Sequence, residues 1–112
     1  LIVYPGSEMP LLDALDLGAP GCISAIANVN AAAISRVIEL FDRGDMAGAR
    51  LEHEAVKRFR KIVEQFAPIP AQKRLLAIAT GDQRWANVRP PLIAMSEEAG
   101  HELAARLPPL TV

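Results

Sequence analysis

The side chains in this sequence that could bind a metal ion lie in two short runs. His101-Glu102 begins like a helix that holds zinc through two histidines four residues apart, with the glutamate as general base. The second histidine is missing, because position 105 is alanine. Glu52-His53-Glu54 gathers three ligand types, but adjacent residues of a helix point in different directions. The sequence therefore predicts no metal site and places these side chains on solvated helix faces.

Two kinds of nucleophile are present, a thiol and several lysine amines. Cys22 is the single cysteine, so it cannot form an internal disulfide, and its apolar surroundings predict an inert buried thiol. A lysine becomes a nucleophile near pH 7 only when it is desolvated. Lys57 and Lys61 lie on the polar face of a predicted amphipathic helix, so we expect ordinary ammonium groups. The sequence therefore predicts neither a reactive thiol nor an activated lysine amine.

Two apolar segments with a helix between them would have to position any site. Residues 1–4 are a continuous apolar run that ends at Pro5-Gly6, and residues 22–26 form a second run. Such runs are typical of parallel strands that are buried on both faces. A helix that begins at Ser7 or Glu8 and stops at Gly18 fits between them. The sequence therefore predicts a parallel βαβ unit.

The rest of the chain is predicted to be helical. Asn30 is a candidate N-cap for a helix over residues 31–42, and Asp45 is a candidate N-cap for a helix from 46 to about 66. Further helices are expected over 71–80 and 96–107, because prolines mark the breaks beside them. The expected buried stripe of the longest helix is Leu51, Ala55, Phe59, Ile62, Val63 and Phe66. Two strands cannot form a stable sheet alone, so they must pair with strands elsewhere.

Composition argues against several classes of function. Hydrophobic residues make up 51% of the 112 residues and charged residues 22%, which is typical of a soluble globular protein. A net charge of -1 with mixed signs gives no footprint for nucleic acid or an anionic membrane. No apolar run approaches the roughly 20 residues that cross a bilayer, and the first residues do not show the charged and apolar regions of a signal peptide. We expect a cytoplasmic protein, and the apolar start without methionine favours a fragment.

The sequence resembles the dihydrodipicolinate synthase / N-acetylneuraminate lyase family over nearly its whole length. The seventh and eighth strands of that family are similar to Leu1-Ile2-Val3-Tyr4-Pro5-Gly6-Ser7-Glu8 and to Gly18-Ala19-Pro20-Gly21-Cys22-Ile23-Ser24-Ala25-Ile26-Ala27-Asn28-Val29. The similarity continues through Ile69-Pro70-Ala71-Gln72-Lys73 to Val88-Arg89-Pro90-Pro91-Leu92. These enzymes are class I, lysine-dependent aldolases on a (β/α)8 barrel, which typically needs around 250 residues.

This resemblance implies an α/β fold of which the chain is only the end. Residues 1–43 would be the last two β/α units of a TIM barrel, and residues 44–112 would be a C-terminal helical extension. The segment itself would be mostly α. Its strands would pair with the first six strands of the same barrel.

The resemblance also implies the activity of the complete protein, a pyruvate-dependent aldolase, lyase or synthase. A 2-keto acid such as pyruvate would form a Schiff base with a lysine on strand six, assisted by a tyrosine on strand five, both upstream of Leu1. An aldehyde or sugar acid would be the second substrate, and no cofactor would be needed. The segment alone would be inactive, Lys73 would be structural, and the complete chain would be a homo-oligomer, most often a tetramer.

Four residues are implied to border the substrate. Gly6 would let the backbone approach the keto acid, and Ile23 would border the pyruvate adduct. Ser7 and Glu8 occupy positions where some members of the family contact the hydroxyls of a sugar acid. Other interpretations stay open: Gly6 as a tight turn, Ile23 as barrel core, and Glu8 as an acid at a helix N-terminus.

The identity of the second substrate and the enzymatic status both have alternatives. Met9 and Ala25 stand where sialic acid lyases have an acid and a serine, so that activity is not expected. A catalytically inactive homologue is one alternative. The other is a stand-alone helical interaction module whose two strands add to the sheet of a partner.

Overall fold

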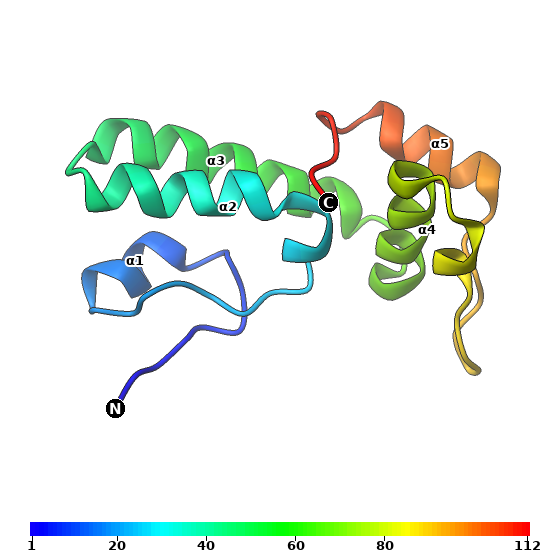
Figure 1. The fold of residues 1–112 in the computed structure, drawn as a ribbon, viewed down its shortest axis with the longest axis horizontal. Coiled ribbons are helices and arrows are strands. Elements are labelled where there is room, and N and C mark those ends of the chain that lie inside the picture. The colour runs from blue at the N-terminus through cyan, green and yellow to red at the C-terminus, as the bar shows by residue number, and fades with distance from the viewer.

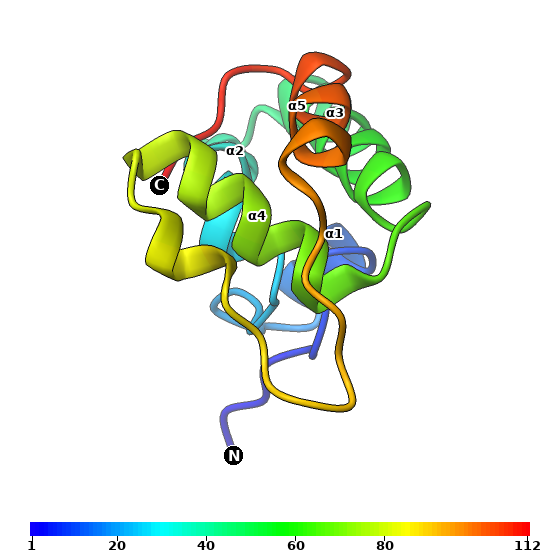
Figure 2. The ribbon, with the colours of Figure 1, turned by 90° about the vertical axis from the view of Figure 1, so that its right-hand side faces the viewer.

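The computed structural model describes all 112 residues, which form five α-helices and one short 3-10 helix. Figure 1 shows α2 and α3 as an antiparallel pair with α1 beside them, while α4 and α5 form a second group at the other end of the long axis. Figure 2 looks at that end, with α4, α5 and the loop between them in front of the other helices. In chain order the elements are α1 (Leu11–Asp16), α2 (Ala27–Asp42), α3 (Met46–Val63), α4 (Pro68–Thr80), η1 (Gln83–Ala86) and α5 (Glu97–Ala105).

The turn between α2 and α3 follows from two adjacent residues. Gly44 has a φ of 78°, in the left-handed region that glycine adopts without steric cost. The N–H groups of Gly44 and Asp45 donate to the carbonyls of Phe41 and Leu40, which closes α2. The Asp45 carboxylate then accepts the Gly48 N–H at 2.9 Å and caps α3. The predicted end of α2 at residue 42 and the predicted N-cap at Asp45 are both confirmed.

Several of the remaining helix boundaries differ from those predicted, and α1 begins at Leu11 rather than at Ser7 or Glu8. Pro68 begins α4, three residues before the predicted start, because the first turn of a helix leaves its N–H groups unpaired and tolerates proline. α2 begins at Ala27 rather than 31, but its backbone breaks at Asn30, which has a non-helical φ of -147°. Two helical pieces meet at this residue, and the second starts where the sequence predicts a helix over 31–42. Asn30 also pairs with Thr111 in an isolated parallel bridge, which returns the C-terminal segment to α2.

The start of α5 agrees with the sequence. Ser96 was predicted to open this helix, and its hydroxyl accepts the Ala99 N–H at 3.1 Å. Two acidic residues, Glu97 and Glu98, occupy the first turn, where the helix dipole favours negative charge. The helix ends at Ala105, two residues before the predicted end.

The two predicted strands do not form. Residues 1–5 and 19–24 are irregular chain, and Leu1, Ile2 and Val3 are exposed. The two segments touch through one backbone hydrogen bond, from the Ile23 N–H to the Pro5 carbonyl at 3.0 Å. A ladder needs neighbouring strands, and this chain has none to offer. The prediction that the segment is mostly helical is confirmed, whereas the βαβ unit is absent from it.

The hydrophobic core joins all five α-helices. Phe59, Leu75 and Leu103 are its largest residues from α3, α4 and α5, and none is more than 2% exposed. None of the helices has both the length and the apolar character that a bilayer crossing would require. The core consists of Leu11, Leu15, Ile26, Val29, Ile34, Val37, Val56, Phe59, Val63, Ala71, Leu75 and Leu103.

The buried face of α3 is rotated relative to the one predicted. Leu51 and Ala55 were expected inside, but both are exposed. His53 was expected on a solvated face, but it is buried. Phe59 and Val63 belong to both faces and are buried as predicted.

Candidate functional site

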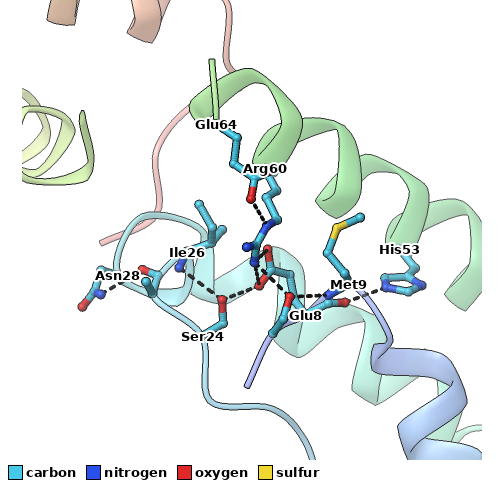
Figure 3. Close-up of polar contacts among 10 residues, drawn as sticks. Glu8, Met9, Ser24, Ile26, Asn28, His53, Arg60 and Glu64 are labelled. Atoms are coloured by element: carbon cyan, nitrogen blue, oxygen red, sulfur yellow. Dashed lines mark hydrogen bonds and ion pairs between the residues drawn. The ribbon is translucent and has the colours of Figure 1, made fainter. Parts of the chain in front are cut away.

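The side chain of Glu8 is fully buried, which is unusual for a carboxylate. Glu8 lies in the turn between residues 1–5 and α1, and its carbonyl accepts the Leu11 N–H at 3.2 Å. Removing a carboxylate from water is costly unless charged or polar partners replace the lost hydration. Figure 3 shows these partners: Arg60 from α3 reaches the carboxylate, and the Ser24 hydroxyl donates to its Oε2. Both carboxylate oxygens are therefore paired.

Arg60 connects this carboxylate to α3. Its Nη1 lies 3.2 Å from each oxygen of Glu8, and its Nε donates to Glu64 Oε1 at 2.6 Å. Burial lowers the pKa of the Arg60 guanidinium, but its hydrogen bond to Glu64 and the charge of Glu8 outweigh burial and raise the pKa overall. Arg60 is therefore a permanent cation held between two acidic side chains.

His53 binds the same turn from a position seven residues, about two helical turns, before Arg60 on α3. Its Nε2 lies 2.8 Å from the backbone carbonyl of Glu8. A carbonyl only accepts hydrogen bonds, so Nε2 carries a proton and donates it here. His53 and Arg60 thus hold the backbone and the side chain of the same residue, as Figure 3 shows.

Two serines complete the cluster. Ser7 lies in the turn that follows residues 1–5, and Ser24 lies at the end of residues 19–24. Ser7 Oγ accepts from Arg60 Nη1 at 2.9 Å and from the Met9 N–H at 3.1 Å. Ser24 Oγ donates to Glu8 and accepts the Ile26 N–H at 3.2 Å. We call Ser7, Glu8, Ser24, His53 and Arg60 the Glu8 cluster. It joins the end of the first segment, the end of the second segment and α3.

The sequence-predicted site residues all lie in this region, but they differ in exposure. Gly6 is exposed, and a Cβ added to it would meet no atom within 4 Å. Ile23 is 71% exposed beside Pro5, to which its N–H is bonded. Ser7 is half-buried and Glu8 is inside. Glu8 therefore lies ahead of α1 and pairs with α3, rather than serving the N-terminus of its own helix.

The other candidate nucleophiles are not activated. Cys22 is half-buried against the core, and burial, followed by the charge of Glu8, raises the pKa of its thiol. The neutral thiol is favoured, as expected for an unreactive cysteine. Lys57 forms an ion pair with Glu54 one turn away. No group of three or more His, Cys, Asp or Glu side chains could hold a metal ion.

Three members of the Glu8 cluster, Ser24, His53 and Arg60, were missed at the level of sequence. His53 and Arg60 were placed on the solvated face of α3, where charged residues usually lie. The available signal was their spacing: seven residues apart, they share one face with Val56 and Val63. Their partner, a buried carboxylate from a distant turn, leaves no trace in the local pattern.

Comparisons with known proteins identify relatives of the chain. The model of the dihydrodipicolinate synthetase family matches residues 1–109. Relatives named 4-hydroxy-tetrahydrodipicolinate synthase share 30% identity over 105 residues in Methanococcoides burtonii, 28% over 109 in Moorella thermoacetica and 32% over 105 in Sorangium cellulosum. These alignments cover 91%, 95% and 93% of this chain but 34%, 36% and 34% of the relatives. The chain thus spans about a third of their length, which supports the expectation of a C-terminal portion.

A solved structure shows the same fold. It is described as the first monomeric dihydrodipicolinate synthase variant, and it superimposes with a TM-score of 0.77 at 23% sequence identity. The alignment covers 94% of this chain and 34% of that one. The arrangement of helices is therefore that of one part of a larger chain.

Proposed function

Because the chain belongs to the dihydrodipicolinate synthetase family, we propose that it is the C-terminal portion of a pyruvate-dependent class I aldolase, lyase or synthase. The observation that carries this proposal is the family match over residues 1–109, together with 28% to 32% identity to three synthases. In this proposal residues 1–43 supply the last two β/α units of a (β/α)8 barrel. Residues 44–112 form the helical extension behind them.

The exposed apolar residues of the first segment support the proposal that further barrel strands pack against this chain in the complete protein. Leu1, Ile2 and Val3 are 118%, 74% and 61% exposed, although runs of this kind are normally buried in parallel sheets. Beside them lies an apolar groove of about 320 Å³. Neighbouring strands would cover both surfaces. The groove is lined by Leu1, Val3, Pro5, Ala14, Leu17, Gly18 and Ala19.

We propose the following roles for this segment in the reaction. A lysine on strand six, outside these residues, forms an imine with the 2-keto acid, and the resulting enamine adds to, or is released from, an aldehyde. Gly6 and Ile23 border the keto acid, since both are exposed at the ends of the two segments. Ser7 lies at the rim. Glu8 supports this rim from inside, because its carboxylate is already enclosed by Arg60 and Ser24.

Borohydride trapping with pyruvate tests this proposal on the complete protein. Reduction of the imine should attach one pyruvate to a single lysine outside residues 1–112. A complete barrel that forms no adduct would contradict the aldolase and indicate an inactive homologue.

A stand-alone interaction module is the second candidate. The exposed residues 1–4 would also suit addition to the sheet of a partner protein. The intact mass of the natural gene product separates the two, since this chain accounts for 12.1 kDa. A mass larger by roughly 20 kDa supports the barrel, given the usual size of that fold. A mass near that of the chain supports the module.

We further propose that the complete protein is a homo-oligomer, most often a tetramer in the family. A solved relative is described as a monomeric variant. Light scattering on the purified protein is therefore the deciding measurement.

A further inference from the structure

The hydroxyl of Ser7 already accepts two hydrogen bonds. One comes from Arg60 Nη1 at 2.9 Å and the other from the Met9 N–H at 3.1 Å. A serine hydroxyl has two acceptor lone pairs and one proton, so both lone pairs are occupied and only the proton remains. Ser7 is half-buried, and in both of its hydrogen bonds its oxygen is the acceptor. Ser7 can therefore act toward a ligand only as a donor.

We propose that Arg60 is a positioning residue for the substrate pocket. Its guanidinium holds the turn at residues 6–8 against the end of the second segment, and it fixes Ser7 as a hydrogen-bond donor toward an oxygen of the bound keto acid. The identification of this region as a pocket rests on the proposed function. Arg60 itself does not touch the reacting atoms and acts through Ser7 and Glu8.

The geometry of the guanidinium explains how one residue can hold both segments. Nη1 binds Ser7 and Glu8 together, and Ser24 of the second segment donates to the same carboxylate. The opposite edge of the group, at Nε, is held by Glu64 one turn further along α3. The planar fork of arginine makes these bonds at once, whereas a lysine ammonium is a single point of charge.

The test compares variants of the complete protein by the pyruvate concentration that gives half-maximal borohydride trapping. Arg60→Met should raise this concentration by about fivefold, within the range expected for one lost hydrogen bond at the pocket. Ser7→Ala should raise it similarly, and the combination should add little, because both substitutions remove the same contact. Arg58→Met is the matched control, since Arg58 is exposed on the same helix, and it should leave the concentration unchanged.

A double variant separates positioning from a simple loss of stability. Glu8→Gln combined with Arg60→Met removes the unpaired buried charge, so the protein should regain stability. The donor to Ser7 is still missing, so half-maximal trapping should stay at the raised concentration. If the double variant traps pyruvate as well as the unsubstituted protein, or if Arg60→Met alone leaves the concentration unchanged, the positioning role is wrong.

Hydrogen exchange keeps the inference testable if the proposed function fails. No adduct in the unsubstituted protein would overturn the function but would not decide the role of Arg60. In that case the amides of Met9 and Ile26, which donate to Ser7 and Ser24, are measured by exchange. Faster exchange at both in Arg60→Met than in Arg58→Met supports the positioning role, and equal exchange overturns it.

Discussion

A buried carboxylate dictates the chemistry of the residues around it. Glu8 needs a cation and hydrogen-bond donors because water does not reach it, and it obtains them from Arg60 and Ser24. These two residues lie 52 and 16 positions away in the chain. The contact therefore orders the ends of two segments that otherwise share one backbone hydrogen bond.

Removal of Arg60 should destabilise the complete protein. Arg60→Met leaves the Glu8 carboxylate buried without its cation, and we expect a loss of about 2 kcal/mol in the free energy of unfolding. This is less than for a fully buried pair, because 26% of the Arg60 side chain is exposed. Urea denaturation followed by circular dichroism measures the change. Arg58→Met, an exposed substitution, should stay within about 0.5 kcal/mol, and equal losses in both variants would contradict the argument.

Cys22 should react slowly with alkylating agents in the folded protein. Burial and the nearby Glu8 charge raise the pKa of its thiol, so the reactive thiolate is depleted at neutral pH. The labelling rate with iodoacetamide should rise only at a more alkaline pH than in the urea-unfolded chain. Mass spectrometry of the peptide that contains Cys22 follows the reaction. Identical pH profiles in the two states would show that the thiol is not shielded.

At the scale of elements, most of the helices were predicted correctly. The two predicted strands do not form, and the buried face of α3 is rotated relative to the predicted one. Gly44 and Asp45 determine the boundary between α2 and α3, one through its left-handed backbone and the other through its side-chain cap. Both signals can be recognised in the sequence itself. The strands require partners that this chain lacks. On α3, His53 lies at helical spacing with the buried residues Val56 and Val63. Its partner, the carbonyl of Glu8 in a distant turn, could not be predicted from that local spacing.

Contact between α4 and α5 depends on a glycine. A Cβ at Gly100 would lie 2.2 Å from Arg74 Cγ, near the base of a side chain whose Nε donates to the Met95 carbonyl at 2.9 Å. Alanine improves helix propensity by about 1 kcal/mol, but overpacking typically costs about 1 to 3 kcal/mol. Gly100→Ala should therefore destabilise the protein, measured as a lower midpoint in urea. Glu102→Ala is the control, because Glu102 is exposed on the same helix. A Gly100→Ala protein that is more stable than the unsubstituted one would show that α4 and α5 accommodate the added methyl group without a loss of stability.

At the scale of the whole molecule, five of the twelve exposed large hydrophobic residues lie on the two irregular segments, residues 1–5 and 19–24. Leu1, Ile2, Val3 and Ile23 are all more than 60% exposed, whereas α1 and α2 bury their apolar faces in the core. Figure 1 shows the first segment projecting away from the helices. The helical part thus has its own core, whereas the two segments have no neighbouring strands within this chain.

The isolated chain should therefore expose apolar surface that a dye-binding measurement can detect. Purified residues 1–112 should bind a hydrophobic dye such as anilinonaphthalene sulfonate and self-associate, because the apolar residues of both segments lack cover. They should form no borohydride adduct with pyruvate, since the proposed lysine lies elsewhere. A co-expressed fragment that supplies the preceding strands of the same gene product should bind this chain, suppress dye binding and restore trapping. Substituting Val3 and Ile23 with lysine should weaken that assembly, whereas Leu51→Lys, exposed on the outer side of α3, should not. A monodisperse isolated chain that neither binds the dye nor recruits the fragment would refute the barrel and favour an independent helical module.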